Sequence, residues 1–272
     1  MILVTGATGH VGRPLVDLLL AAGQRVRALT RDPSRAGLPE GVETARTEDL
    51  PLDGIDSVFF VLAAFPDGPA ELIRRAREHG VRRIVALSSY TALDDDPKNF
   101  IAVRHRDLER RIEESGLEWT ALHPAGGLAV TALEWREQIR TTGVARGPYA
   151  RAHSAPLHER DIAEVGARAL LTDDLLGTKP LFSGPESITY AGRASLIGEA
   201  VGRPVRFEEI THDEARKEMA EVGIPPGAIE ARLKMFAQLV DNPHPISPVD
   251  RFLGKPGRTF RQWAEDHVAD FT

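Results

Sequence analysis

Short apolar runs alternate with amphipathic stretches through the first half of the chain. The runs typical of β-strands cover residues 2–4, 25–29, 42–45, 58–62, 83–87 and 118–122. Between them, apolar residues recur every three or four positions, which predicts helices over residues 11–22, 69–79 and 99–115. Strands that alternate with helices in this way are typical of a parallel sheet with helices on its faces. The pattern therefore predicts an α/β fold with a doubly wound parallel sheet.

The pattern changes after residue 124. A glycine-containing loop leads to a helix that includes Trp135, and another helix is predicted over residues 160–171. Helices separated by Gly and Pro follow, with one short strand near residues 204–208. We predict a first domain of residues 1–124, to which residues 152–183 return, and a smaller, mostly helical lobe of residues 125–151 and 184–272.

A glycine-rich turn follows the first predicted strand and opens the first predicted helix. Gly6 permits the tight turn, Gly9 lets the backbone approach a pyrophosphate, and Gly12 lets the helix pack on the strand. The start of the helix then offers N–H groups to the phosphates. This predicts a Rossmann-like dinucleotide site, with an ordinary glycine-containing turn as the alternative. The residues predicted to contact the cofactor here are Gly6, Thr8, Gly9, His10, Val11 and Gly12.

The end of the second strand bears on the choice of dinucleotide. A site selective for NAD usually places Asp or Glu there, to accept a hydrogen bond from the ribose 2′-hydroxyl. Here the strand ends in Leu29-Thr30-Arg31, and a guanidinium favours a 2′-phosphate. Asp32 could still hold the ribose hydroxyl, or it could only start a turn. We expect NADP(H) to be preferred, with NAD(H) as the alternative.

Several further motifs accompany the glycine turn. They are Ala-Leu-Thr-Arg-Asp-Pro at 28–33, Gly-Val-Arg-Arg-Ile-Val at 80–85, Ser-Gly-Leu-Glu-Trp-Thr at 115–120, Glu-Arg-Asp-Ile-Ala at 159–163 and Phe-Ser-Gly-Pro-Glu at 182–186. With these motifs the chain resembles, over nearly its whole length, the NmrA-like group of atypical short-chain dehydrogenase/reductases. The resemblance implies a Rossmann-like fold, an NAD(P) cofactor and a likeness to quinone reductases.

The catalytic residues cannot be carried over from the larger short-chain dehydrogenase family. That family uses a Tyr-x-x-x-Lys pair, and none of the three tyrosines of this chain is followed four residues later by Lys. The first substitute is His105, which is expected to share a helix face with Ile101, Leu108 and Ile112 and to point at the sheet. In quinone-reductase-like members a histidine stands in this place, followed four residues later by Glu, here Glu109. His105 is either a proton donor or a core histidine that holds the cofactor ribose.

Tyr90 is the second catalytic candidate, and its alternative role is an aromatic wall of the pocket. Ligands of open α/β sheets bind beyond the carboxyl ends of the strands. The strand ends predicted to line the cofactor trough are Leu62, Ala63, Ala64, Ser88 and Pro124. The family resemblance implies Arg before this proline and Asn a few residues on, where this chain has His123 and Thr131. Trp135 either closes the substrate side or packs in the core.

Composition narrows the classes of partner. A net charge of −6 gives no basic stripe for nucleic acid. The chain has no Cys and no metal-binding spacing of His, so we expect no metal. No apolar run approaches the roughly 18 residues that span a bilayer, and the apolar N-terminus does not resemble a signal peptide. We expect a cytoplasmic monomer or homodimer that acts on a small molecule.

These observations lead to one main functional hypothesis and two alternatives. The main hypothesis is an NAD(P)H-dependent reductase that transfers hydride to a small carbonyl or quinone-like acceptor. A quinone-like acceptor needs little acid help, so the missing Tyr–Lys pair is tolerable. The first alternative is a non-catalytic NAD(P)-sensing regulatory protein, which the missing pair favours. The second is an epimerase-like use of the bound cofactor.

Overall fold

The computed structural model describes residues 1–242 and 246–272. The chain folds into two compact units, each built from two segments. Unit 1 consists of Met1–Pro124 and Glu159–Leu181, and unit 2 of Ala125–His158 and Phe182–Thr272, so the chain passes between them three times. The sequence placed the return to the first domain at residues 152–183, a longer segment than 159–181.

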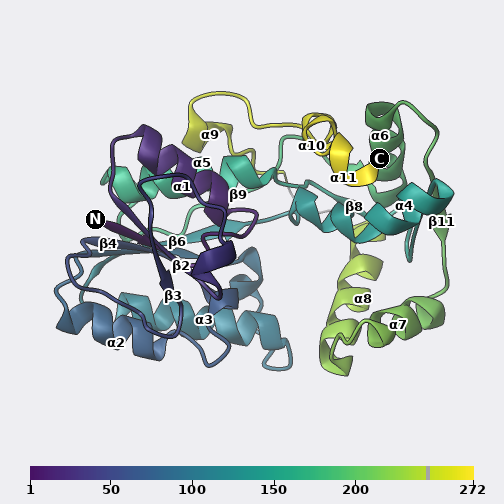
Figure 1. The fold of residues 1–272 in the computed structure, drawn as a ribbon. Coiled ribbons are helices and arrows are strands. Elements are labelled where there is room, and N and C mark those ends of the chain that lie inside the picture. Colours follow the sequence, from purple (N-terminus) through teal and green to yellow (C-terminus); the bar gives the residue numbers. More distant parts are fainter. Residues whose placement is uncertain (243–245) are drawn as a thin grey trace. The chain divides into compact units, whose positions relative to one another are not determined.

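Unit 1 is built on the main sheet. Among the described residues this sheet has seven strands in the order β3-β2-β1-β4-β5-β6-β9, and the registers from β3 to β6 are parallel (Figure 1). The strands are β1 (Ile2–Val4), β2 (Val26–Thr30), β3 (Glu43–Arg46), β4 (Ser57–Val61), β5 (Arg83–Leu87), β6 (Glu118–Pro124) and β9 (Leu181–Phe182). The order 3-2-1-4-5-6 is that of a doubly wound Rossmann sheet, so the predicted fold class is confirmed.

Helices cover both faces of this sheet. They are α1 (Gly12–Ala21), α2 (Ala70–Glu78), α3 (Phe100–Glu113) and α5 (Glu159–Leu171), with short 3₁₀ turns η1 (Pro33–Arg35), η2 (Leu62–Ala64) and η3 (Tyr90–Leu93). In Figure 1, α1 and α5 lie on one face and α2 and α3 on the other. Leu72 of α2 and Leu108 and Ile112 of α3 pack with Phe60 and Ile84 of the central strands. This burial holds α2 and α3 against one face of the sheet.

One predicted position in α3 is wrong. Ile101 was expected to lie on the buried stripe, but 44% of it is exposed, whereas Leu108 and Ile112 are fully buried. Ile101 belongs to the first turn of α3, where only Ala102 is buried. The buried face of the helix therefore includes the charged residue Glu109 but does not include Ile101.

Unit 2 has a core of its own. Its elements are η4 (Ala129–Trp135), α4 (Arg136–Thr142), β7 (Val144–Gly147), β8 (His153–Ser154), β10 (Ile188–Thr189), α6 (Tyr190–Val201), β11 (Arg206–Glu209), α7 (His212–Glu221), α8 (Pro226–Asp241), α9 (Asp250–Leu253), α10 (Phe260–Asp266) and α11 (Val268–Phe271). β7 pairs in parallel with β11, and β8 pairs antiparallel with β10. Trp135, Ile139, Ile197 and Trp263 are buried together, so Trp135 is a core residue of this unit. Across 1–242 and 246–272, no helix combines the length and the apolar character needed to cross a membrane.

Candidate functional site

The glycine turn links β1 to α1 and packs against the end of β4. Gly6 has a φ of +60°, a left-handed conformation that glycine adopts without a steric penalty. A Cβ added to Gly6 would lie 3.4 Å from Cβ of Val61. A Cβ added to Gly12 would lie 2.2 Å from the carbonyl oxygen of Gly6. Helix α1 can therefore start this close to the turn only because position 12 carries no side chain.

The backbone amides at the start of α1 are available to a ligand. The N–H of Gly9 donates to the carbonyl of Gly6 at 2.9 Å, which closes the turn. The N–H groups of His10, Val11 and Gly12 donate to no acceptor in the described part of the chain, and no side chain caps α1. Unpaired N–H groups at a helix start, where the positive end of the helix dipole lies, are suited to bind phosphate. The turn thus fits the pyrophosphate of a dinucleotide.

The loop after β2 presents positive charge. The carboxylate of Asp32 accepts hydrogen bonds from the hydroxyl of Ser34 at 2.6 Å and from its backbone N–H at 3.1 Å, and these bonds lower the pKa of Asp32. Arg31 is exposed and has no hydrogen bond or ion pair with any described residue. Arg13 of α1, which the sequence analysis missed, donates to the carbonyl of Gly37 at 2.5 Å, so a second guanidinium lies at this loop. The loop therefore suits a 2′-phosphate better than a bare ribose hydroxyl.

The other predicted cofactor contacts lie at the carboxyl ends of the strands. Leu62, Ala63 and Ala64 form η2 directly after β4, where Leu62 is buried and Ala63 is exposed. Ser88 follows β5 and is buried, and Pro124 is the last residue of β6 and half-buried. The packing of Gly6 on Val61 brings the end of β4 next to the glycine turn. Contact of these residues with a cofactor stays a prediction.

A buried carboxylate lies below these strand ends. Glu109 of α3 is 4% exposed. Its Oε1 is 2.8 Å from Nε2 of His123 on β6 and also accepts a hydrogen bond from the hydroxyl of Ser88, while its Oε2 is 3.0 Å from Nζ of Lys179. Burial alone would raise the pKa of Glu109, but the hydrogen bonds from His123, Ser88 and Lys179 outweigh it and hold the pKa at about 2. The carboxylate is therefore ionised at neutral pH.

Lys179 is the member of this cluster that the sequence analysis missed. It follows α5 and precedes β9, some 70 residues from Glu109 along the chain, and its side chain is 38% exposed. It also lies 2.5 Å from Oε1 of Glu113, one turn along α3. No spacing in the sequence links Lys179 to these glutamates. The segment that carries Lys179 reaches α3 only through the long connection from β6 to β9.

His105 lies one turn before Glu109 on the same helix. Its Nδ1 is 3.4 Å from Oγ of Ser88, so the side chain does face the end of β5 as predicted from the helix pattern. Burial lowers the pKa of His105 to about 4, and the charges of Arg104 and His123 act in the same direction, while Glu109 opposes them. At neutral pH the imidazole is therefore uncharged. Its role, whether proton transfer or ribose binding, stays a proposal.

Tyr90 lies two residues beyond Ser88 and begins η3. The turn is fixed by Ser89, whose hydroxyl oxygen accepts a hydrogen bond from the N–H of Thr91 at 3.2 Å. Tyr90 itself is half-buried. Tyr90 on η3 thus follows the end of β5 in sequence, whereas His105 on α3 reaches the same strand end through its contact with Ser88, and the roles of both stay predictions.

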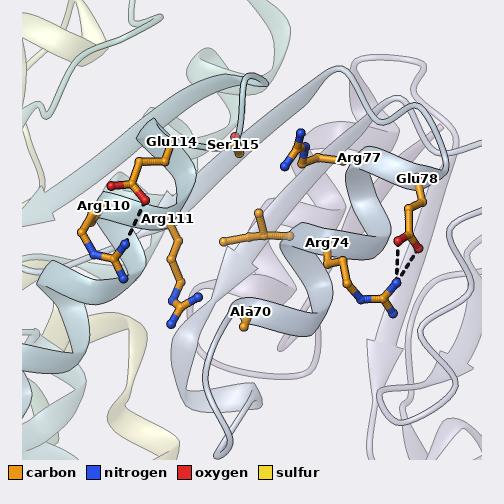
Figure 2. Close-up of a pocket in the computed structure, with 9 residues that line it drawn as sticks. Ala70, Arg74, Arg77, Glu78, Arg110, Arg111, Glu114 and Ser115 are labelled. Atoms are coloured by element: carbon orange, nitrogen blue, oxygen red, sulfur yellow. Dashed lines mark hydrogen bonds and ion pairs between the residues drawn. The ribbon is translucent and has the colours of Figure 1, made fainter.

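A pocket of about 580 Å³ lies elsewhere, between α2 and α3 (Figure 2). Arg74, Arg77, Arg110 and Arg111 line it with Glu114. Most of these guanidinium groups are paired with acids of their own helices, as with Arg110 and Glu114 at 2.8 Å, and they are about half exposed. Such pairs are typical of a solvated helix surface and contribute little to the stability of the fold. The pocket does not include the glycine turn or any predicted site residue.

The expected family contacts after β6 are changed in this chain. His123, which stands where the resemblance implies Arg, is buried and bound to Glu109. The hydroxyl of Thr131, near the implied Asn, donates to the carbonyl of Leu128 at 2.7 Å within η4 of unit 2. Within the ranges that the structure describes, no group of three or more His, Asp and Glu side chains is arranged to hold a metal ion.

Comparison with known proteins bears on this site. The model of a family described as NAD(P)H-binding matches residues 6–173. The (4-alkanoyl-5-oxo-2,5-dihydrofuran-3-yl)methyl phosphate reductase of Streptomyces griseus is 36% identical over 282 residues, which cover 100% of this chain and 99% of the relative. The NAD(P)H azoreductase of Xenophilus azovorans is 31% identical and covers the two chains to the same extent.

Solved structures agree on the fold. The NADPH-dependent quinone oxidoreductase of Escherichia coli, solved in complex with NADPH, superposes with a TM-score of 0.79. It is 20% identical, and the match covers 98% of this chain and 99% of the other. At this identity the likeness extends to the fold alone.

Proposed function

Because this chain belongs to the NAD(P)H-binding family, as its NmrA-like motifs indicated, we propose that it is an NAD(P)H-dependent reductase of a small carbonyl or quinone-like acceptor. Two of the matched relatives that span its whole length are named as reductases. One of them is named for an alkanoyl-oxo-dihydrofuran phosphate and the other for azo compounds. What these names share is an electron-poor conjugated system, and we propose an acceptor of this class here.

The observation that carries the proposal is the row of unpaired amides at the start of α1. Its N–H groups at His10, Val11 and Gly12 would bind the pyrophosphate, and Gly9 leaves room for its close approach. Arg31 and Arg13 would bind the 2′-phosphate, so NADP(H) is the preferred cofactor. When bound, the reduced dinucleotide supplies the hydride, and the chain positions it.

The same reading accounts for the missing Tyr–Lys pair. Hydride addition to a conjugated carbonyl or quinone leaves a delocalised anion, which water can protonate. The residues near the end of β5 then need only orient the two reactants. A cytoplasmic location and a monomeric or homodimeric state stay predictions from the sequence.

The test is to mix the purified protein with NADPH and a panel of acceptors, which includes a naphthoquinone, an azo dye and an acyl-substituted unsaturated lactone. Oxidation is followed by the absorbance of the reduced cofactor, and NADPH and NADH affinities are measured by calorimetry. We expect turnover with at least one acceptor and tighter binding of NADPH than of NADH. Binding of NADPH without oxidation across the panel would contradict the proposal and favour a sensing role.

A further inference from the structure

The Glu109 cluster has a direction that fixes which atoms carry protons. We infer that the Glu109 carboxylate orients a chain of hydrogen bonds through Ser88 that leaves Nε2 of His105 as a hydrogen-bond acceptor for a ligand hydroxyl. The identity of the ligand in this inference rests on the proposed function, which names a dinucleotide and a reduced product as the molecules that the site holds. It assigns positioning roles to Glu109, His123 and Lys179, whose side chains do not themselves reach the ligand.

The first step is the carboxylate itself. An ionised carboxylate can only accept hydrogen bonds, so every partner of Glu109 must be a donor. Nε2 of His123 at 2.8 Å therefore carries a proton, and the ammonium of Lys179 at 3.0 Å supplies another. The low pKa of Glu109 agrees with this saturated set of donors.

The second step is Ser88. A hydroxyl has one proton, and Ser88 donates it to Oε1 of Glu109. Toward its other neighbour, Nδ1 of His105 at 3.4 Å, the Ser88 oxygen can then only accept. Nδ1 of His105 must be the donor of that contact.

The third step is the imidazole of His105. Its pKa of about 4 leaves it neutral at pH 7, so the ring has one proton in all. If that proton is on Nδ1, Nε2 has a lone pair and no hydrogen. The charged and titratable groups that act on the ring are Glu109, Arg104 and His123. None of them donates a hydrogen bond to Nε2 in the described structure.

The matching ligand chemistry is a hydroxyl group, which donates to the free lone pair. Two sources share this chemistry: a ribose hydroxyl of the dinucleotide, and a hydroxyl of the reduced product. A ketone or quinone oxygen has no proton and does not fit. His105 in this form therefore holds a hydroxyl, or takes its proton, and does not supply the proton in the reductive direction.

The direct test is the tautomer of His105 in the protein without ligand. In protein labelled with ¹⁵N-histidine, long-range ¹H–¹⁵N spectra at pH 7 distinguish the two ring nitrogens, and His105→Gln assigns the signals among the nine histidines. We expect a protonated Nδ1 and an unprotonated Nε2. A proton on Nε2, or a cationic ring, would overturn the inference, and neither outcome depends on any enzymatic activity.

A pair of glutamate variants tests the direction of the chain. In Glu109→Gln the carboxamide can donate to Ser88, which frees the Ser88 proton for Nδ1 of His105, so we expect the Nε2–H tautomer to appear. Glu113→Gln is the matched control, because Glu113 lies on the same helix and binds Lys179 at 2.5 Å without contacting Ser88. Its His105 signals should keep the wild-type pattern. If Glu109→Gln does so too while it remains folded, Glu109 does not orient the chain.

Calorimetry distinguishes the two hydroxyl sources. If the ribose hydroxyl is the ligand, His105→Ala should lower the affinity for NADP⁺ by about tenfold. It should leave 2′,5′-ADP, which lacks the nicotinamide ribose, unchanged. If the product hydroxyl is the ligand, NADP⁺ binding should stay and inhibition by the alcohol or hydroquinone product should weaken. If both NADP⁺ binding and product inhibition are unchanged in His105→Ala, His105 accepts no ligand hydroxyl. Failure of the wild-type protein to bind NADP⁺ at all would reject the proposed cofactor, but it would not affect the tautomer measurement.

Discussion

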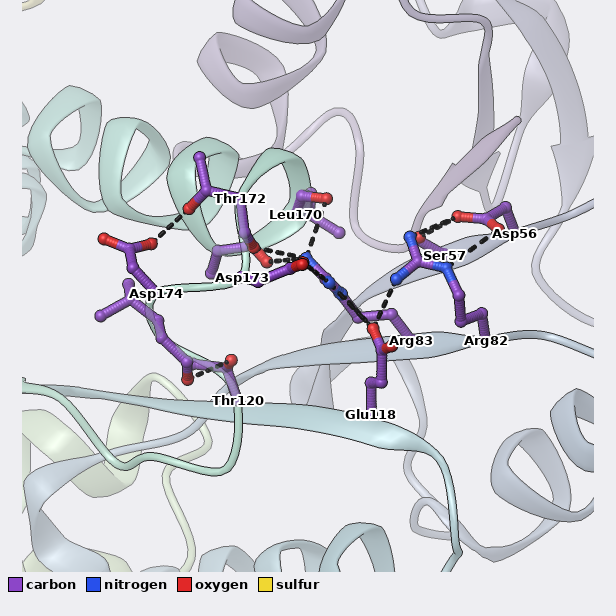
Figure 3. Close-up of polar contacts among 12 residues, drawn as sticks. Asp56, Ser57, Arg82, Arg83, Glu118, Thr120, Leu170, Thr172, Asp173 and Asp174 are labelled. Atoms are coloured by element: carbon purple, nitrogen blue, oxygen red, sulfur yellow. Dashed lines mark hydrogen bonds and ion pairs between the residues drawn. The ribbon is translucent and has the colours of Figure 1, made fainter.

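The two ends of strands β5 and β6 each have a buried charge, and the two charges are satisfied in different ways. At the amino end, Arg83 is 1% exposed. Its guanidinium donates to Glu118 at 2.9 Å, to the carbonyl oxygens of Ala169 at 3.0 Å and Thr172 at 2.5 Å, and pairs with Asp173 (Figure 3). We call this network closed, because carboxylates and backbone carbonyls together accept hydrogen bonds from the whole planar edge of the Arg83 guanidinium.

At the carboxyl end, the buried charge is the carboxylate of Glu109. Its own hydrogen bonds are also complete, but the chain through Ser88 continues to His105 and ends on a ring nitrogen of a half-buried side chain. The difference shows how one pair of strands separates stability from function. The closed network ties α5 to β5, and the open one offers an acceptor where ligands of doubly wound sheets bind.

The largest expected effect is at the closed network. Replacing Arg83 with Met leaves the buried carbonyls of Ala169 and Leu170 without their guanidinium donor, so we expect a loss of about 3–5 kcal/mol of unfolding free energy. Urea denaturation measures this. The adjacent Arg82→Met is the control, because Arg82 is 46% exposed, and it should cost less than about 1 kcal/mol. Equal losses in both variants would refute the distinction.

The next largest effect separates binding from folding at the glycine turn. Gly9→Val places a branched side chain where the pyrophosphate would lie, and we expect NADPH affinity to fall by about 100-fold or more, roughly 3 kcal/mol. An added Cβ meets only the carbonyl oxygen of Gly6, at 3.1 Å, so the protein should still fold. Gly227→Val, where an added Cβ meets no atom within 4 Å, should bind NADPH like wild type in the same calorimetric titration.

A smaller effect should appear on acidification, at the open network only. The pKa of His105 is about 4 in the folded protein and 6.5 in its unperturbed form, so below pH 6.5 the unfolded chain binds a proton that the folded one does not. Stability should therefore fall by about 2 kcal/mol between pH 6.5 and 5 from this group. The depressed pKa of Glu109 adds a further loss below pH 4.5.

His105→Gln isolates this contribution, since all other titrating groups stay. Urea denaturation of wild type and variant at pH 6.5 and pH 5 should show a shallower pH dependence in the variant. The same slope in both proteins would mean that His105 titrates in the folded state as it does in the unfolded one.

The smallest expected effect concerns cofactor choice. Arg31→Ala removes an exposed guanidinium from the carboxyl end of β2, and we expect NADPH affinity to fall about tenfold with NADH affinity unchanged. Arg25→Ala, just before the amino end of the same strand and paired with Glu43 at 2.9 Å, is the control and should alter neither. An equal loss for NADPH and NADH in Arg31→Ala would argue against a 2′-phosphate contact.

Most of the sheet could be predicted from the sequence because its signals are local. The apolar run at 58–62 marks a strand buried on both faces, and β4 is found at Ser57–Val61. The glycine turn could be predicted equally well. Once a strand is expected before it and a helix after it, their close packing requires a residue without a side chain at position 12. In both cases the residues that determine the structure are neighbours in the chain.

The Glu109 cluster could be predicted only in part. Helix spacing placed His105 one turn before Glu109, but it also counted Ile101 as buried, because periodicity does not show where a helix extends past the sheet. Lys179 had no sequence signal, since its contact with Glu109 depends on the return of the chain beside β6. Contacts set by topology across such separations require the three-dimensional structure.

The three passages of the chain between its units limit how this protein can be recombined. Unit 2 is not one cassette, because Trp135 comes from its first segment and Trp263 from its second, and both lie in one core. A single crossover with a relative would pair halves of two different cores. A working chimera needs matched junctions near residues 124, 158 and 181, so that both segments are exchanged together.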